Sequence, residues 1–208
     1  MITLHHLNQS RSKRIIWLLE ELGLEYKLIP YQRDAVTFLA PPELKSVHPL
    51  GKSPVVEDKG VVIAESAAIT DYLIEKYGQG RLAPEKHSHD HIEYMQWLHF
   101  AESSGVLPLL LQTFIDLDKA ETTFLKGYAD SEARKIMSYL DQSMHDKTFL
   151  VGETLSGADI MISFILEWLH KNGSLADFPN LESYYKRLLL IPAYQKANLI
   201  EAEHANTD

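Results

Sequence analysis

Residues 50–58 of this 208-residue chain read LGKSPVVED, and residues 65–69 read ESAAI. The first stretch combines a loop, a proline and a short apolar run, which predicts a strand that begins after Pro54. Lys-Gly at 59–60 predicts a tight turn into a second strand, and Glu-Ser at 65–66 predicts a helix start. A strand edge and a helix N-terminus therefore lie close together in the chain. Such a pair favours binding of a small zwitterionic peptide, whose main chain pairs with the edge and whose carboxylate meets the helix end.

The segments around this stretch alternate between strand and helix. Apolar spacing predicts strands and helices in turn over Ile2–Leu7, Arg11–Leu22, Tyr26–Tyr31, Glu43–Val47, Val55–Asp58, Val61–Ala64 and Ser66–Tyr77. Gly23 is placed to end the first helix in a left-handed cap. The β-α-β-α-β-β-α order is thioredoxin-like. It predicts a mixed sheet, because the first two strands need a helical crossover and the last two form a hairpin.

The second half of the chain shows helical patterns and no convincing strand. Two glycines and a proline within Gly78–Pro84 indicate a linker. We therefore predict an α/β domain at residues 1–80, a linker at 81–86 and an all-helical domain at 87–208. Helices are expected over 89–117 with a kink at Pro108, over 122–147, from Ser156 with Asp159 completing a capping box, near 181–190 and from Pro192, and the polar tail 202–208 is expected to fray.

Composition limits the classes of function. The net charge is −9, which argues against general nucleic-acid binding. No apolar run is long enough to cross a bilayer or to act as a signal peptide. The chain has no cysteine, which removes disulfides, thiolate metal sites and a catalytic protein thiol. We therefore expect a soluble cytoplasmic protein without nucleic-acid or membrane partners.

Two groups of histidines need separate interpretation. His87, His89 and His91 alternate at an expected helix start, where a spacing of two does not place neighbours on one helical face. We expect these side chains to be solvated and to form no metal site. His5 and His6 are adjacent in the first predicted strand. Adjacent strand residues point to opposite faces, so at most one of the two is expected to face the core.

Five segments together resemble one known family. They are the Ser-Arg-Ser turn at 10–12, IIWLLEELGL at 15–24, HPLGKSPVV at 48–56, Glu-Ser at 65–66 and SGAD at 156–159. In this order, and with an all-helical second half, they resemble the cytosolic glutathione transferases over nearly the whole chain, most closely bacterial and fungal members with a Ser-Arg-Ser first turn. The resemblance implies a thioredoxin-like domain followed by a helical bundle, a homodimer, and reduced glutathione as co-substrate without a metal.

The resemblance places activation of the glutathione thiol at the first turn. A free thiol titrates near 8.5, so an enzyme must stabilise the thiolate. A hydroxyl at a helix N-terminus does so through a hydrogen bond and the helix dipole. Ser10 is our candidate donor, Arg11 adds a cation, and Gln9 and Ser12 are expected contacts. A different alignment register makes Gln9 or Asn8 the donor instead, and the simpler alternative is that Ser10 or Ser12 only caps the helix.

The resemblance also assigns the rest of the glutathione site. It implies a cis peptide bond before Pro54, which leaves the backbone of Ser53 to pair with the cysteinyl main chain of glutathione. Glu65 would accept from the γ-glutamyl ammonium, and Ser66 would donate to the γ-glutamyl carboxylate at the helix N-terminus. Lys52 would meet the glycine carboxylate. The alternatives are an ordinary trans proline, a serine that only caps its helix and a solvated lysine.

The expected function is therefore that of an enzyme, a glutathione transferase whose thiol attacks a small electrophile. Two alternatives remain open: a glutathione-dependent peroxide or disulfide reductase, and a non-catalytic glutathione-binding regulatory protein of the same fold. The sequence does not specify the electrophile, and Asp159 is interpreted as a folding residue rather than an acid catalyst. Candidate walls of the acceptor site are apolar residues that more often form core: Leu7, Phe100, Leu107, Leu111 and Phe114.

Overall fold

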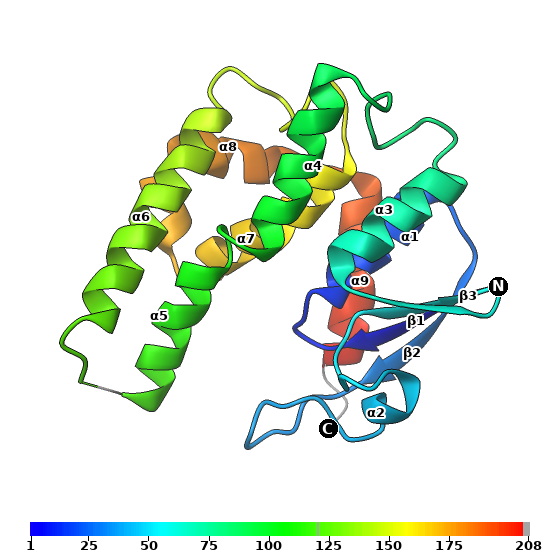
Figure 1. The fold of residues 1–208 in the computed structure, drawn as a ribbon, viewed down its shortest axis with the longest axis horizontal. Helices are drawn as coiled ribbons and strands as arrows, with labels where there is room; N and C mark the ends of the chain where they lie inside the picture. Colours follow the sequence, from blue (N-terminus) through cyan, green and yellow to red (C-terminus); the bar gives the residue numbers. More distant parts are fainter. Residues whose placement is uncertain (120, 206–208) are drawn as a thin grey trace. The chain divides into compact units, whose positions relative to one another are not determined.

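The computed structural model describes residues 1–119 and 121–205 (Figure 1). The chain forms two compact units. The first comprises residues 1–82 together with the described residues from Leu188 onward, and the second comprises the described residues between 83 and 187. The change from the first unit to the second falls inside the predicted linker. The return of the chain to the first unit after residue 187 was not predicted.

The first unit contains a mixed sheet, as predicted. Its strands are β1 (Ile2–Leu7), β2 (Tyr26–Tyr31), β3 (Val55–Asp58) and β4 (Val61–Ala64). Their order is β2-β1-β3-β4, with β1 parallel to β2 and antiparallel to β3, and β3 antiparallel to β4. The hairpin turn places Lys59 at φ 50° and Gly60 at φ 86°, the positive values that a tight two-residue turn requires.

Helix α1 (Ser12–Leu22) forms the centre of the first unit. Five consecutive residues, Ile15 to Leu19, are fully buried, and Trp17 among them is part of the core. Gly23 ends the helix at φ 68° in the predicted left-handed cap. The later helix α9 (Pro192–Ala205) packs along α1 (Figure 1). The rings of Trp17 and Tyr194 lie 4.5 Å apart between them. This contact explains why the end of the chain belongs to the first unit.

Two further helices of the first unit follow their predictions. Helix α2 (Leu44–Val47) is one short turn, and α3 (Ser66–Tyr77) has the predicted bounds. Ile69 and Leu73 of α3 are fully buried. Helix α3 packs against α1 and the β3–β4 hairpin. The N-termini of α1 and α3 and the loop that precedes β3 therefore belong to the same packed unit.

The single kinked helix predicted over 89–117 is wrong. The structure has two helices, α4 (His89–Glu102) and α5 (Leu107–Asp118). A Cβ at Gly105 would lie within 2.9 Å of three neighbouring heavy atoms, so the break needs a residue without a side chain. Pro108 lies in the first turn of α5, where its missing N–H costs no helical hydrogen bond.

The other helices of the chain differ from the predictions mainly at their ends. Their bounds are α6 (Leu125–Ser143), α7 (Gly157–Lys171), the 3-10 turn η1 (Ser174–Asp177), which was not predicted, and α8 (Pro179–Leu188). The capping box of Ser156 and Asp159 at the start of α7 is confirmed. Residues 202–205 continue α9 instead of fraying, and 206–208 lie outside the described residues.

Candidate functional site

The turn between β1 and α1 is held by bonds from distant parts of the first unit. Gln9 has a positive φ of 50° and is exposed, and its N–H donates to Glu201 Oε1 over 2.7 Å. The Arg33 guanidinium donates to the carbonyls of Asn8 and Gln9, and its backbone N–H donates to Asn8 Oδ1 over 2.9 Å. The side-chain oxygen of Asn8 is therefore engaged within the protein. The backbone around Ser10 is fixed from both sides.

The two serines of this turn are hydrogen-bonded to each other. Ser10 Oγ and Ser12 Oγ lie 2.8 Å apart, and the Ser12 N–H donates to Ser10 Oγ over 3.1 Å. Ser10 keeps 7% of its surface exposed, whereas Ser12 keeps none. Ser10 thus precedes α1 by two residues and satisfies its first N–H, while Ser12 is placed to act on a ligand only through Ser10.

The prediction for the adjacent histidines is wrong, because His5 and His6 are both buried. His5 bonds to Tyr31 Oη and Glu57 Oε1, each over 2.9 Å. His6 Nδ1 lies 2.7 Å from Ser12 Oγ on the other side of the strand. His5 meets side chains of the two flanking strands, whereas His6 faces Ser12 of α1 and Glu201 of α9, so each ring finds polar partners on its own side of the sheet.

The loop before β3 is tied to the same end of β1. Ser53 Oγ accepts from the Leu7 N–H over 3.1 Å and donates to the His5 carbonyl over 2.8 Å. The Ser53–Pro54 peptide bond is cis, as the resemblance implied. The Leu7 N–H also faces Ser12 Oγ at 3.2 Å. The Ser53 loop and the Ser10 turn therefore meet at Leu7.

The start of α3 joins this arrangement through Arg14. Arg14 is buried, and its Nη2 donates to Ser66 Oγ over 2.9 Å. Glu65 is exposed at φ 69° and ψ 116°, a strained backbone conformation of the kind that accumulates at functional sites. Lys52 is exposed on the loop that precedes Pro54. The predicted site residues thus lie on three connected segments of one packed unit.

Positive charge gathers beside the first turn. Burial and the neighbouring Arg11 guanidinium lower the pKa of Arg33, and Glu201 acts in the opposite direction, so two cations and one carboxylate lie at this place. Both cations remain charged at neutral pH, because arginine does not deprotonate in proteins. Their field favours an anion at the turn. Arg33, Arg14, His6 and Glu201 were not predicted, and no local sequence pattern marks them, since each acts through a contact that is distant in sequence.

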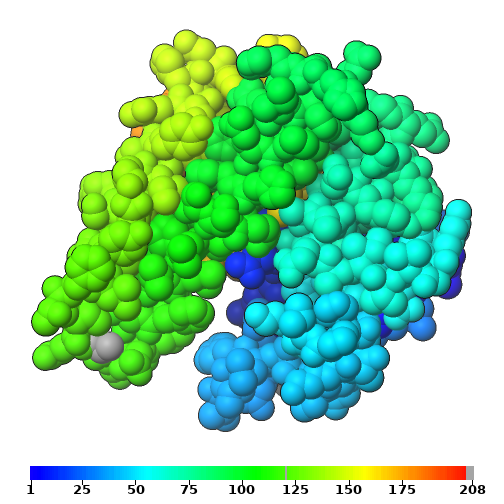
Figure 2. Space-filling model, in the orientation of Figure 1, coloured from blue at the N-terminus to red at the C-terminus, as the bar shows by residue number. Residues whose placement is uncertain are grey.

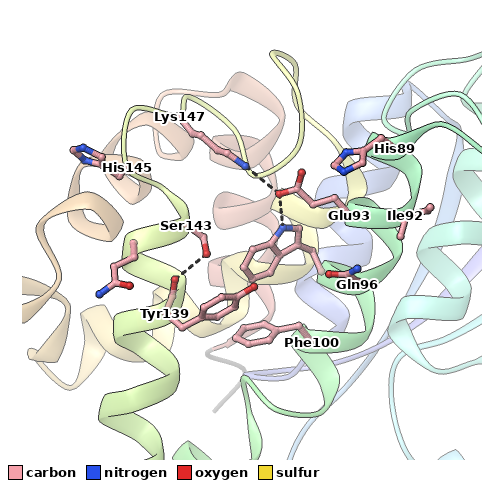
Figure 3. A pocket seen from close by; sticks show the side chains of 11 residues that line it. His89, Ile92, Glu93, Gln96, Phe100, Tyr139, Ser143, His145 and Lys147 are labelled. Atoms are coloured by element: carbon pink, nitrogen blue, oxygen red, sulfur yellow. Dashed lines mark hydrogen bonds and ion pairs between the residues drawn. The ribbon is translucent and has the colours of Figure 1, made fainter.

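The second unit contains a pocket of its own, between α4, α6 and the segment that follows α6 (Figure 3). Its volume is about 710 Å³. The ring of Trp97 stacks with Tyr139 at 5.7 Å and meets Phe100 edge-on at 5.1 Å. At the rim, Lys147 Nζ donates to Glu93 Oε1 over 3.0 Å. Phe100, a predicted acceptor wall, therefore lines this pocket of the helical unit.

Within residues 1–119 and 121–205, no three histidine, aspartate or glutamate side chains come together as metal ligands. The exposed His87 and His89 and the half-buried His91 do not form such a group. No helix in the described part of the chain has the length and apolarity needed to cross a bilayer.

Comparison with known proteins agrees with this geometry. The N-terminal domain model of glutathione S-transferases matches residues 1–75, and the C-terminal domain model matches residues 108–192. Glutathione S-transferase 3 of Schizosaccharomyces pombe is 36% identical over 177 residues, covering 79% of this chain and 72% of that protein. Glutathione S-transferase 1 of Saccharomyces cerevisiae is 30% identical over 219 residues, covering 93% and 92%.

A solved structure gives the same result. The crystal structure of a glutathione S-transferase from Actinobacillus pleuropneumoniae is 38% identical, with a TM-score of 0.89, covering 97% of this chain and 93% of that one. Shorter matches reach elongation factor 1-gamma; that of Danio rerio is 33% identical over 129 residues, only 27% of its length. Both halves of the chain match the family models, and the thioredoxin-like and helical parts are those of a solved member, so the chain belongs to the glutathione S-transferase family.

Proposed function

We propose that this protein binds reduced glutathione in its first unit and ionises the thiol for attack on a small electrophile. The observation that carries the proposal is the meeting of three segments at the end of β1. The Ser10 turn and the Ser53 loop both bond to Leu7, and Arg14 joins the start of α1 to Ser66. These are the segments that hold the two ends and the middle of a tripeptide in the predicted site.

The glutathione backbone would lie along the second and third of these segments. Ser66 at the N-terminus of α3 would donate to the γ-glutamyl carboxylate, and exposed Glu65 would accept from its ammonium group. The main chain of Ser53 would pair with the cysteinyl residue, since the Ser53 hydroxyl is already used in holding β1. Exposed Lys52 would meet the glycine carboxylate.

The thiol would lie at the first turn, with the Ser10 hydroxyl as its donor. Asn8 could donate only through its side-chain NH2 group, whose orientation is fixed by the bond from the Arg33 N–H to Asn8 Oδ1, so we favour Ser10. Gln9 is exposed and would contact the ligand beside Ser10. Arg11 acts with Arg33 as a positive field that favours the thiolate over the thiol. Ser10 therefore fills the proposed catalytic role, and the buried Ser12 hydroxyl is hydrogen-bonded to it.

Once ionised, the thiol can enter one of two reactions, conjugation or reduction. Conjugation needs only the thiolate and an acceptor. Reduction of a peroxide or disulfide on the same site would need two glutathiones in turn, because the chain has no cysteine to carry the thiol. We therefore favour conjugation and keep reduction as the alternative.

A second candidate function follows from the partial matches to elongation factor 1-gamma. Elongation factor 1-gamma is not named as a transferase, although part of it matches this chain. A glutathione-binding role without turnover is therefore the competing proposal. The two are separated by activity. A transferase conjugates a chlorinated aromatic such as 1-chloro-2,4-dinitrobenzene, whereas a binding protein is retained on immobilised glutathione without turnover.

The proposed partners include a second copy of the chain. The second unit presents a continuous surface formed by α5 and α6 (green to yellow-green in Figure 2). Large apolar side chains on these helices are exposed, among them Phe114, Leu117 and Tyr128. Apolar surface of this kind supports a homodimer. The proposal also includes a cytoplasmic location without membrane partners, and the net charge of −9 argues against nucleic-acid partners.

The test combines binding and turnover in one set of proteins. Wild type and the Ser10→Ala variant are loaded on immobilised glutathione and then assayed for conjugation of 1-chloro-2,4-dinitrobenzene. We expect both to be retained and the variant to be slower by at least about tenfold, in the range of a lost charge-stabilising donor. Wild type that is retained without any turnover would support the binding role, and wild type that is not retained would contradict the proposal.

A further inference from the structure

Four side chains of the first unit form a continuous line from the first turn into the core. Ser10 Oγ lies 2.8 Å from Ser12 Oγ, and Ser12 Oγ lies 2.7 Å from His6 Nδ1. The other ring nitrogen, His6 Nε2, lies 3.1 Å from Glu201 Oε2. Neither Nε2 nor Oε2 has a hydrogen-bond partner elsewhere in the described residues. His6 and Ser12 are fully buried, whereas Ser10 keeps 7% of its surface exposed and the Glu201 side chain keeps 14%.

The hydroxyl protons in this line have a definite direction when His6 is neutral. A carboxylate has no proton to give, so Glu201 beside Nε2 favours the tautomer with its proton on Nε2. Nδ1 is then an acceptor at 2.7 Å from Ser12 Oγ, closer than the Leu7 carbonyl, which Ser12 Oγ faces at 3.1 Å, so the single proton of Ser12 goes to Nδ1. The contact between the serines is then made by the proton of Ser10. Every member of the line therefore points inward, from Ser10 toward His6.

We propose that His6 receives the glutathione thiol proton through Ser10 and Ser12. This inference rests on the proposed function. The thiol gives its proton to Ser10 Oγ, Ser10 passes its own proton to Ser12 Oγ, and Ser12 passes its own to His6 Nδ1. At the end the thiolate accepts a hydrogen bond from Ser10, and an imidazolium faces the ionised Glu201. No proton is lost, and each hydroxyl again carries one proton.

The surroundings of His6 favour this end state. Glu201 and His204 face the ring from α9, with the two imidazole ring centres 6.4 Å apart. Burial alone would raise the pKa of Glu201, but His6, the Gln9 N–H and the Lys13 ammonium lower it overall, so the carboxylate stays ionised at neutral pH. Arg33 also acts on Glu201 and competes with His6 for its negative charge.

In this arrangement Ser12, His6 and Glu201 are positioning residues, since only Ser10 touches the sulfur. Glu201 has a second role in the same geometry, because its Oε1 accepts from the Gln9 N–H. One carboxylate of the last helix therefore holds both the backbone of the turn and the proton acceptor behind it. When the product leaves, the proton returns along the two hydroxyls to water at the turn.

The test counts protons as glutathione binds. Thiolate is measured by its ultraviolet absorbance, and protons released to solvent are measured by calorimetric titration in two buffers of different ionisation enthalpy. In wild type we expect thiolate to form with close to no proton released, because His6 holds it. In His6→Asn, which keeps a hydrogen-bonding group facing Ser12 but cannot hold the proton, we expect one proton released for each thiolate formed.

Kinetics supply the second readout. Glu201→Gln keeps an oxygen for the Gln9 N–H but removes the charge that faces the imidazolium. We expect kcat for conjugation to fall about 100-fold, within the usual range for a lost proton acceptor, with KM for glutathione unchanged. The matched control is Glu203→Gln, an exposed residue of the same helix, which should behave as wild type.

The outcomes are separable. One proton released per thiolate in wild type, or His6→Asn identical to wild type, would overturn the relay while leaving the proposed function intact. Wild type that binds glutathione without forming thiolate would contradict the proposed function itself. If His6→Asn does not fold, as judged by circular dichroism, the proton count and the kcat of Glu201→Gln decide the question.

Discussion

Arg14 Nη2 donates to Ser66 Oγ over 2.9 Å and thereby joins the first turns of α1 and α3. A guanidinium only donates, so the serine oxygen is the acceptor in this contact and its proton is not used there. The same serine stands at the end of the helix proposed to receive the γ-glutamyl carboxylate. The glutathione site and the packing of two helices therefore depend on one hydroxyl.

Replacing Ser66 with alanine tests that dependence. We expect glutathione to bind about tenfold to 100-fold more weakly, because a hydrogen bond to a charged group contributes about 1.5–3 kcal/mol. The free energy of unfolding should also fall, since Arg14 loses a buried acceptor. Calorimetric titration measures the affinity, with Ser174→Ala in the second unit as the control. Unchanged affinity in Ser66→Ala would remove this residue from the site.

Replacing Lys52 tests how much an exposed positive charge contributes to glutathione affinity. The side chain is exposed, so Lys52→Ala should leave the thermal stability unchanged. We expect a loss in glutathione affinity of about threefold to tenfold at low ionic strength, and a smaller loss at high salt because an exposed ion pair is screened. Lys59→Ala, in the exposed hairpin turn, is the matched control. An affinity loss that does not depend on salt would point to a role other than charge.

Asp159 should affect folding and not glutathione binding. It is fully buried and accepts from the N–H groups of Leu150 and Ser156 and from the hydroxyls of Ser156 and Tyr184. Asp159→Ala leaves several buried donors without an acceptor, so we expect a loss of at least about 3 kcal/mol in the free energy of unfolding. Denaturant unfolding measures this loss. Glutathione affinity of the folded variant should match wild type, and a large affinity loss in a fully stable variant would contradict the assignment.

The sequence predicted the elements of the first unit because their signals are local. Short apolar runs and the Lys59–Gly60 turn define β3 and β4, and Gly23 marks the end of α1. The break between α4 and α5 was missed because it depends on how closely neighbouring atoms approach Gly105. A proline inside an apolar pattern indicates a kinked helix. Only the packing shows that one helix ends there and a second helix begins.

The candidate site was predicted in its segments but not in its connections. The local motifs placed Ser10, Ser53 and Ser66 on the segments that the structure brings together. The partners that hold them could not be predicted. Glu201 reaches the first turn from the last helix, and the His6 ring is buried against Ser12 of α1 and Glu201 of α9. Contacts between residues far apart in sequence leave no periodic signal.

A pH dependence of stability follows from Asp58. Burial alone would raise its pKa, but hydrogen bonds from Lys76, Tyr77 and Tyr72 lower it from 3.8 to about 2. A carboxyl with a lowered folded-state pKa stabilises the fold above its unfolded value and loses that contribution as pH falls toward 2. Asp58→Asn should therefore destabilise the protein most at neutral pH, with the difference from wild type shrinking in acid. Thermal unfolding at several pH values measures this, and a constant difference would contradict it.

The central claim is that glutathione binds with its thiol ionised by the Ser10 turn. It is tested most directly by following thiolate absorbance of bound glutathione as a function of pH in wild type and in Ser10→Ala. We expect the bound thiol in wild type to titrate well below its usual value near 8.5, and most of this shift to be lost in the variant. A bound thiol that titrates like free glutathione, or a shift that survives unchanged in Ser10→Ala, would contradict it.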